Sequence, residues 1–343
     1  VVVLVLRFAS PHYFASANLF NPLPSAQFIA NLKSLKQYEG PDVWYPPAIQ
    51  WLSKPMIWFS VKNIVLYGYG IGLSALAIVG LISLFASEKI QKKTRRSWLL
   101  YGIVGWGLAI TIYQSLQFVQ AIRYFIIVYP IFAILSGIGW FWLSQLPKSK
   151  VYFYALSILL VSLLLIWPLA FIGIYHQKHS RIAASEWMHQ SLPSHSLIGH
   201  EYWDDPLPIG VPGSTKQFVG ESLHVFDQDS FTKWRVLNAQ LNQLDYYVLS
   251  SNRAWGSITA VPHKYPRMAQ YYQDLFAGKT DFELVAQFTN YPNLRYLGIP
   301  IEFSTDQADE SFTVYDHPKV MVYMNKNTKR QPELTGYDRT TTK

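Results

Sequence analysis

Arg123 is the side chain in this sequence best suited to bind a phosphate group. It precedes Tyr124 at the start of a long apolar stretch that continues through Tyr129-Pro130. The planar guanidinium of an arginine can bind a phosphate through two parallel hydrogen bonds, as a lipid phosphate at the membrane surface requires. The residues alone favour the other interpretation, a side chain that extends to the lipid head groups and anchors a span, because interfacial arginines occur in membrane proteins of every function.

Asp42 lies in an aromatic, proline-rich segment (residues 40–47) shortly before Gln50-Trp51. A carboxylate beside aromatic rings is typical of sugar binding, because rings stack on sugar faces while the acid accepts hydroxyl protons. The alternative is an ordinary turn acid in a proline-rich loop, which the pattern by itself favours. His12, between Pro11 and Tyr13, leaves the same two interpretations.

Residues 200–206 carry one imidazole, His200, and three carboxylates, Glu201, Asp204 and Asp205, within six positions. Trp203 lies among these residues. Such a cluster can bind a divalent ion or a polyhydroxylated substrate. The spacing matches no common metal-ligand pattern, and adjacent aspartates before a proline are ordinary turn chemistry. The sequence therefore leaves metal dependence open.

Composition excludes several other kinds of site. The chain has no cysteine, which rules out disulfides, cysteine zinc sites and a thiol nucleophile. It also lacks a Walker loop, a nucleophile elbow and a His-Glu-x-x-His sequence. We therefore expect no soluble cofactor.

The chain is too apolar for a simple soluble enzyme. Of its 343 residues, 50% are hydrophobic and 15% are charged, against roughly 25% charged in soluble domains. The net charge of +8 arises in residues 1–176, which hold 13 Lys and Arg against 3 Asp and Glu. These cations lie between long apolar stretches, as membrane topology requires. We therefore expect a membrane lipid partner and no nucleic acid.

Four apolar stretches have the roughly 20 residues needed to cross about 30 Å of hydrocarbon. The basic residues between the first two and between the last two indicate cytoplasmic loops. Residues 9–63 and the C-terminal domain are then extracytoplasmic, in a multi-pass protein of the cell membrane. The apolar start predicts the end of a truncated span at residues 1–8, and hence the C-terminal part of a longer protein. The four predicted spans are Ile64–Ala86, Ser97–Leu116, Tyr124–Leu146 and Val151–Tyr175.

The outer stretch contains an amphipathic pattern, with Phe28, Ile29, Leu32 and Leu35 on one helical stripe. This pattern predicts a helix on the membrane surface. A helix packed on the C-terminal domain fits it equally well.

The C-terminal part alternates helical and strand patterns, which predicts an extracytoplasmic α/β domain at residues 177–325. It follows a four-helix membrane region at residues 64–176 and precedes a polar, disordered tail at residues 326–343. We expect helices near 181–190, 230–241 and 266–276. We expect strands near 197–202, 246–249, 282–288, 312–315 and 320–323.

Several segments resemble membrane glycosyltransferases of the GT-C type, the relatives of protein O-mannosyltransferases and aminoarabinose transferases. The membrane-side segments are 42–51, 62–73 and Arg123-Tyr124 with Tyr129-Pro130, and the domain segments are 201–208, 249–253 and 310–320. The resemblance spans most of residues 7 to 325. It implies a hexosyl- or pentosyltransferase that moves a sugar from a polyprenyl-phosphate donor to an extracytoplasmic acceptor.

The resemblance also assigns roles to residues. It implies an acidic general base in the first outer loop of the family, upstream of this chain, and neither Asp42 nor the Asp204-Asp205 pair occupies that place. We therefore expect no catalytic residue here and no activity of this part alone. Arg123 matches the family position, near the outer end of a late span, that would hold the donor's phosphate. With the resemblance, phosphate binding and lipid anchoring become equally good interpretations of Arg123.

Two other functions remain open on the sequence. The first is a membrane-anchored scaffold whose outer domain binds a glycan or a protein partner without catalysis. The second is a transporter, which is disfavoured because the spans carry almost no ionisable residue near mid-membrane. The sugar, the acceptor and the length of the lipid carrier are not determined by these residues.

Overall fold

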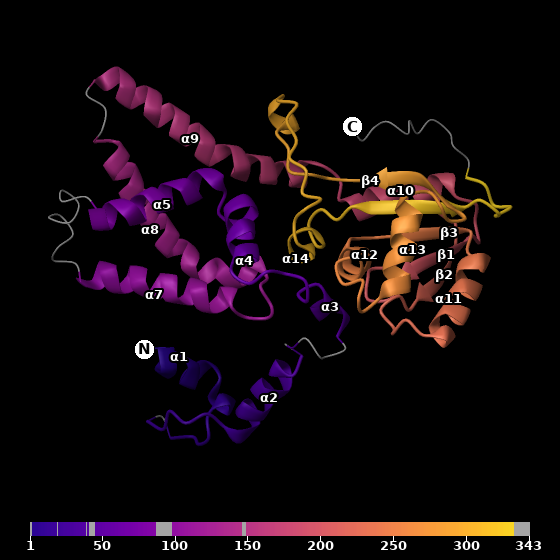
Figure 1. Cartoon of the computed structure of the whole chain (residues 1–343), viewed down its shortest axis with the longest axis horizontal. Coiled ribbons are helices and arrows are strands. Elements are labelled where there is room, and N and C mark those ends of the chain that lie inside the picture. The colour runs from indigo at the N-terminus through magenta and orange to yellow at the C-terminus, as the bar shows by residue number, and fades with distance from the viewer. Residues whose placement is uncertain are drawn as a thin grey trace.

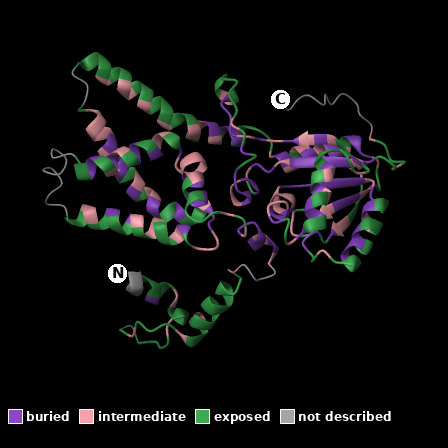
Figure 2. Cartoon of the chain, viewed as in Figure 1, coloured by how far each residue is buried: buried purple, intermediate pink, exposed green. Residues whose placement is uncertain are grey.

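The computed structural model describes residues 2–18, 20–38, 40, 45–86, 98–145 and 149–332. A helical half and a sheet-containing half lie end to end, with a small N-terminal helical unit beside them (Figure 1). Buried residues concentrate in the sheet half, whereas much of the helical half is exposed or half-buried (Figure 2). Its exposed residues include large apolar side chains such as Ile78 and Ile158. The architecture therefore agrees with a helical region followed by an α/β domain.

The helical half is built on the close approach of α5 (Ile71–Ala86) and α8 (Tyr129–Leu143). Two glycines make this approach possible. A Cβ on Gly80 would collide with the backbone of Leu135, and one on Gly139 would collide with the backbone of Leu76. Small residues at such crossings allow helix backbones to pack in contact.

The first predicted span is broken. Helix α4 (Trp58–Asn63) continues into the π-helical turn η2 (Ile64–Gly68), and the axis then bends by 119° before α5. Gly70 has a φ of +83° at this bend, a conformation that glycine adopts without the steric cost of a Cβ. The apolar run from Ile64 to Ala86 is therefore not one straight helix.

The prediction of four full spans and a truncated one is wrong for the described residues. Two helical stretches are long and apolar enough to cross a membrane, Ile122–Leu143 and Lys150–Ser191, or three if the bent pair counts as one span. Helix α7 (Trp98–Ser115) is not among them, because its glycines and its polar last turn dilute its apolar character. Helix α1 (Val2–Ala9) is shorter than a span.

The remaining helical elements of the first half connect these helices. The 3₁₀ helix η3 (Ile122–Val128) leads into α8, and α9 (Lys150–Ile172) leads through the 3₁₀ turn η4 (Gly173–His176) into the sheet domain. The amphipathic pattern forms α2 (Ala26–Lys36), which follows the 3₁₀ turn η1 (Pro11–Tyr13) and has no buried residue. It is therefore not packed into the core of the sheet domain.

The sheet domain is a three-layer α/β sandwich. Its strands are β1 (Leu197–Glu201), β2 (Val219–Leu223), β3 (Tyr246–Leu249), β4 (Phe282–Phe288) and β5 (Val320–Asn325), in the order β2-β1-β3-β5-β4. Strands β2, β1 and β3 are parallel, whereas β5 is antiparallel to both β3 and β4.

Alternation along β3 assigns each side chain to one of two cores. Tyr246 and Val248 pack with α10 (Ser180–Ser191) on one face. Tyr247 and Leu249 pack on the other face with three helices. These are α11 (Phe231–Gln243), α12 (Arg253–Ile258) and α13 (Pro266–Phe276). All four strand residues are buried, as expected for a strand covered on both faces.

Most predicted elements of this domain are confirmed, but one predicted strand does not form and several short elements were not predicted. Residues 312–315 do not form a strand, because Asp309 caps the short helix α14 (Glu310–Thr313) by accepting a hydrogen bond from the Ser311 amide. Neither β2 nor α12 was predicted. Strand β2 is largely exposed, so it lacks the apolar run by which a buried strand is identified.

Candidate functional site

A cavity of about 790 Å³ lies where the segment before α4, the helical half and the sheet domain meet. The short helix α3 (Pro46–Ile49) contributes one wall and packs against α12. The start of η3 contributes a second wall, and the ends of β1 and the start of α12 contribute the third. The described lining residues are Leu35, Tyr38, Tyr45, Pro47, Ala48, Gln50, Trp51, Val119, Arg123, Tyr124, Trp203, Arg253, Glu310, Ser311 and Tyr315.

Arg123 lines this cavity without a carboxylate partner among the described residues. It occupies the first turn of η3, at the point where the chain enters the apolar stretch 122–143. Its side chain is exposed, and its guanidinium carbon lies 5.4 Å from the ring centroid of Tyr124. A cation over an aromatic ring in this geometry keeps its hydrogen-bond donors available for an anion.

A second arginine lines the opposite wall, but it is already paired. The Nε of Arg253 donates to Glu310 Oε1 at 2.7 Å, and its Nη1 donates to the Trp203 carbonyl at 2.6 Å. Gln50 Nε2 donates to the other oxygen of Glu310 at 3.1 Å. Burial alone would lower the pKa of Arg253, but attraction to Glu310 outweighs it and the pKa is raised. This network ties the segment around α3 to the sheet domain.

Aromatic rings form much of the remaining cavity wall. Trp203, two residues after the end of β1, has a φ of 81°, and its half-buried indole packs against the ring of Tyr45. The ring centroids of Trp203 and Tyr45 are 5.7 Å apart. Stacked and edge-on rings of this kind bind sugar faces and apolar chains. Tyr38, Trp51, Tyr124 and Tyr315 also contribute rings to the lining.

The aspartate pair proposed from the sequence as a ligand site does not line the cavity. Arg181 Nη2 donates to Asp204 Oδ1 at 3.2 Å, and Arg181 Nη1 lies 2.6 Å from Asp205 Oδ2. The hydroxyl of Ser251 donates to the other oxygen of Asp204 at 2.5 Å. The side chain of Asp204 is only 2% exposed, against 61% for Asp205. Asp204 therefore holds α10 and the segment before α12 together.

Of the other residues proposed from the sequence, some line the cavity and some do not. Gln50, Trp51, Trp203, Arg123 and Tyr124 all line the cavity, although they come from distant parts of the sequence. His12 is exposed in η1, where its ring packs against Tyr13, and it does not line the cavity. Asp42 lies outside the described residues.

Sequence reasoning did not single out Arg253 and Glu310, which complete the cavity. Both residues stand in segments that carried the resemblance, 249–253 and 310–320, so a signal was present without a role attached to it. Among the described residues, no group of three or more His, Asp or Glu side chains is arranged to hold a metal ion. Among the described residues, the cavity's chemistry therefore rests on Arg123, which has no carboxylate partner there, on the paired acid Glu310 and on several rings.

Comparison with family models, curated proteins and solved structures finds no match in any of the three. The function is therefore inferred from the site's own chemistry. An unpaired arginine can bind an anion, and the adjoining rings can bind sugar or apolar groups. The apolar helix that begins at Arg123 adds a surface suited to a hydrocarbon chain.

Proposed function

We propose that this chain is the C-terminal part of an integral membrane glycosyltransferase. In this proposal a polyprenyl-phosphate sugar is the donor, and the acceptor lies outside the membrane. Residues 9–63 and the sheet domain are extracytoplasmic. The observation that supports the proposal is the cavity itself, in which Arg123 has no carboxylate partner among the described residues and stands at the start of an apolar helical stretch.

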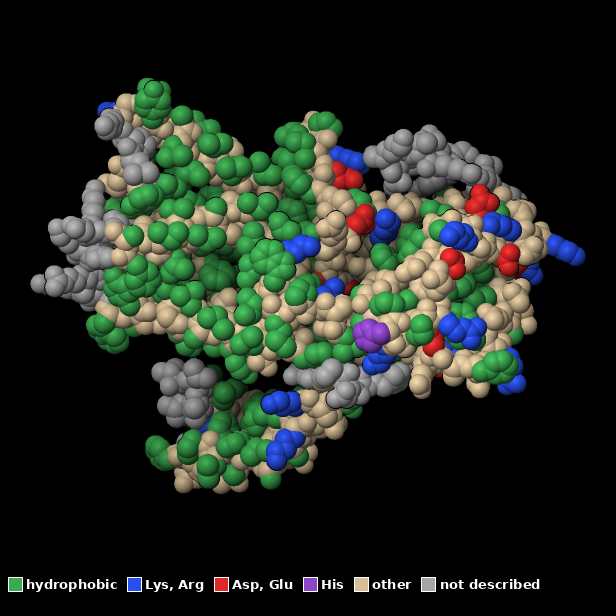
Figure 3. Space-filling view, viewed as in Figure 1, with side chains coloured by type: hydrophobic (Ala, Val, Ile, Leu, Met, Phe, Trp, Pro, Cys, Tyr) green, Lys and Arg blue, Asp and Glu red, His purple; other side chains and the backbone are tan. Residues whose placement is uncertain are grey.

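The donor would bind across the boundary between the two halves. Arg123 would hold the phosphate, and the polyprenyl chain would lie along the apolar surface that follows it in the sequence. Figure 3 shows apolar side chains over the helical half and most of the charged side chains over the sheet domain. The sugar would then face the aromatic rings of Tyr45 and Trp203.

Sugar transfer also needs charge stabilisation and a general base. A fixed cation beside the leaving lipid phosphate stabilises the negative charge that develops there, and Arg123 would have this role. Among the described lining residues Glu310 is the sole carboxylate, and both of its oxygens accept hydrogen bonds. The proposal therefore assigns the base to residues other than those described at the cavity.

Donor binding tests the role of Arg123. The chain is incorporated into lipid nanodiscs, and its affinity for undecaprenyl phosphate is measured for the native sequence and for Arg123→Gln. Charge-assisted hydrogen bonds contribute about 1.5–3 kcal/mol, so the variant should bind roughly 10- to 150-fold more weakly. Lys62→Gln is the matched control, because Lys62 is a cation near the same boundary that does not line the cavity.

Unchanged affinity of Arg123→Gln would refute the proposed phosphate site. An equal loss in Lys62→Gln would show that general basic charge, and not the cavity, attracts the lipid.

The scaffold function is the second candidate, and the pairing of Glu310 favours it. A cavity without a free carboxylate can bind a glycan or a lipid-linked sugar without transferring it. Sugar release from a polyprenyl-phosphate sugar by the natural full-length polypeptide separates the two functions. Donor binding with no release would favour the scaffold.

A further inference from the structure

One loop of the sheet domain, here named the Leu297 loop (Asn293–Glu302), is closed upon itself by hydrogen bonds. Asn293 pairs with Glu302 in an antiparallel bridge, and the Leu294 amide donates to the Ile301 carbonyl at 2.9 Å. Gly298, with a φ of 76°, ends the 3₁₀ turn η5 (Arg295–Leu297) and reverses the chain. The loop therefore has a defined shape of its own.

The Leu297 loop is also attached to the end of α9. The Asn293 amide donates to the Ala170 carbonyl at 2.8 Å, and the Tyr296 hydroxyl donates to the Leu169 carbonyl at 3.0 Å. A Cβ on Gly173 would collide with the Asn293 carbonyl oxygen, so the contact is tight. These hydrogen bonds fix the position of the loop along the axis of α9.

The tip of this loop is apolar and exposed. Leu297, Ile299 and Ile301 are 49%, 41% and 45% exposed, although each is an aliphatic residue. At the base, Arg295 forms an ion pair with Glu302 at 2.9 Å. In Figure 3 the projection beside the end of α9 presents apolar side chains, with charged ones on its sheet-domain side. In Figure 1 the loop projects upwards beside the end of α9, at the level where the two halves meet.

We propose that the Leu297 loop inserts its apolar tip into the outer head-group region of the lipid bilayer. This inference rests on the proposed function, because it requires that α9 spans the membrane. Membrane-surface elements of this kind bury their apolar side about 5–10 Å into the boundary between head groups and acyl chains. The inserted tip would hold the sheet domain at a fixed height over the cavity.

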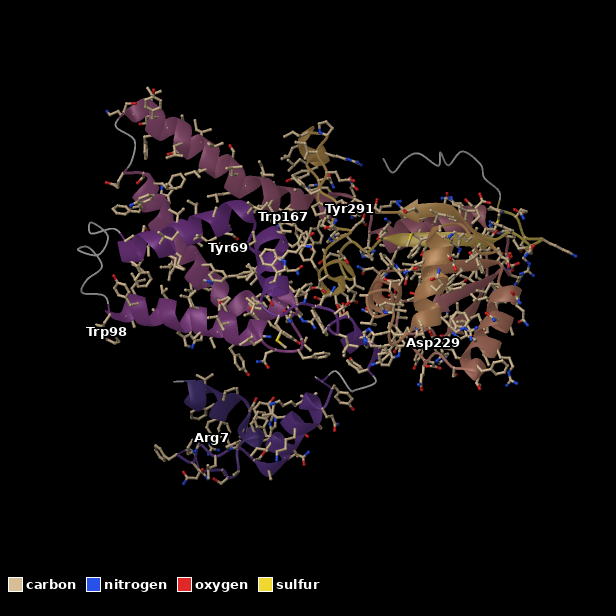
Figure 4. The ribbon with its side chains drawn as sticks, viewed as in Figure 1. Arg7, Tyr69, Trp98, Trp167, Asp229 and Tyr291 are labelled. Atoms are coloured by element: carbon tan, nitrogen blue, oxygen red, sulfur yellow. The ribbon has the colours of Figure 1, made fainter. Side chains whose placement is uncertain are left out.

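Three observations identify lipid as the occupant of this surface. Ala170 is the one buried residue of α9, so the helix exposes apolar side chains up to the point where the loop is attached. Trp167 lies in the last turns of α9, with its ring 6.1 Å from that of Phe303 after the loop. Figure 4 labels Trp167 at this level. Tryptophans collect where hydrocarbon meets head groups, and the apolar tip is continuous with that zone.

The absence of cysteine from the chain gives a direct test. A single cysteine is introduced as Ile299→Cys and labelled with nitrobenzoxadiazole, whose emission shifts to the blue and brightens in an apolar environment. The labelled chain is reconstituted in phosphatidylcholine vesicles that contain lipids spin-labelled either near the head group or at the end of the acyl chain.

Two further cysteines serve as references. Leu159→Cys is on the exposed surface of α9, and Lys279→Cys is exposed before β4, at the end of that strand remote from the loop. We expect blue-shifted emission at position 299 and stronger quenching by the shallow spin label than by the deep one. Position 159 should also be quenched, whereas position 279 should emit as in water.

The possible results are distinct. Water-like emission at position 299 with quenching at position 159 would overturn the loop insertion while leaving the membrane placement of α9 intact. Blue-shifted emission at position 299 without lipid quenching would also overturn it and would indicate a second protein surface, such as another copy of this chain. No quenching at position 159 would overturn both the membrane placement and the inference.

Discussion

Glu201 makes the stability of the sheet domain depend on pH. Its carboxyl group is fully buried at the end of β1, where Oε1 accepts hydrogen bonds from the Tyr247 hydroxyl at 2.9 Å and from the Tyr272 hydroxyl. The pKa of Glu201 is raised from 4.5 to about 8, mainly by burial and also by the nearby charge of Asp204, while the hydrogen bonds from the two tyrosines partly oppose the shift.

The raised pKa determines whether a higher pH stabilises or destabilises the domain. Because the pKa is higher in the folded state, folded Glu201 keeps its proton between pH 4.5 and about 8 while the unfolded chain loses it. Its contribution to stability is fully present below pH 4.5 and is lost as the pH rises to about 8. Each pH unit in this window corresponds to about 1.4 kcal/mol, so the loss is of the order of 5 kcal/mol.

Glu201→Gln removes the titration and keeps an oxygen that accepts from both tyrosines. We expect the free energy of opening of β3 to fall with pH in the native chain and to stay nearly level in the variant. Hydrogen exchange of the chain in detergent, followed by mass spectrometry of peptides covering Tyr246–Leu249 and corrected for intrinsic exchange rates, measures this quantity. Glu283→Gln is the control, because Glu283 is exposed on β4.

An equal pH slope in the native chain and in Glu201→Gln would refute the reasoning. The reasoning would also be refuted if the free energy of opening of β3 in the native chain were the same at pH 5 and pH 8. A flattened slope in Glu283→Gln would show that the surface charge of the domain, and not the buried acid, is responsible.

Two further predictions concern packing and the cavity wall. Gly80→Ala should destabilise the helical half by about 1–3 kcal/mol, because the new methyl group would collide with α8. Gly102→Ala has open space inside α7 and should stabilise the helix by about 0.5–1 kcal/mol, since alanine loses less backbone entropy than glycine. Thermal unfolding in detergent compares the two variants. Glu310→Gln should loosen the contact between α3 and α12 by about 1.5–3 kcal/mol, since it weakens a hydrogen bond to the charged Arg253. Faster hydrogen exchange in α12 would report this, and unchanged exchange would contradict it.

Local patterns were sufficient to predict most elements of the sheet domain. The run Tyr246–Leu249 is apolar at every position, and the structure buries all four side chains between two helical layers. Pro266 and Gly278 bracket the helix α13, as a proline at the start and a glycine after the end of a helix predict. These features depend on neighbours in the sequence, so the sequence determined them.

The membrane region shows where local patterns fail. Hydropathy treats the run from Ile64 to Ala86 as one span, but it contains no information on the backbone of Gly70, whose positive φ accompanies the bend of 119°. The contact that packs α5 on α8 depends on Gly80 and Gly139 facing each other, and the two glycines are far apart in the sequence. Only the folded chain decides both features.

The same distinction between sequence-local and tertiary features applies to the residues of the cavity. The sequence by itself marked Arg123 as a candidate phosphate ligand, because its type and its place before an apolar stretch are local properties. It could not show that Arg123 has no carboxylate partner among the described residues, nor that Asp204 is paired with Arg181. Pairing depends on which side chains the fold brings within hydrogen-bond distance. The tertiary structure therefore decided which charges remain available for a ligand, and the sequence decided only which charges there are.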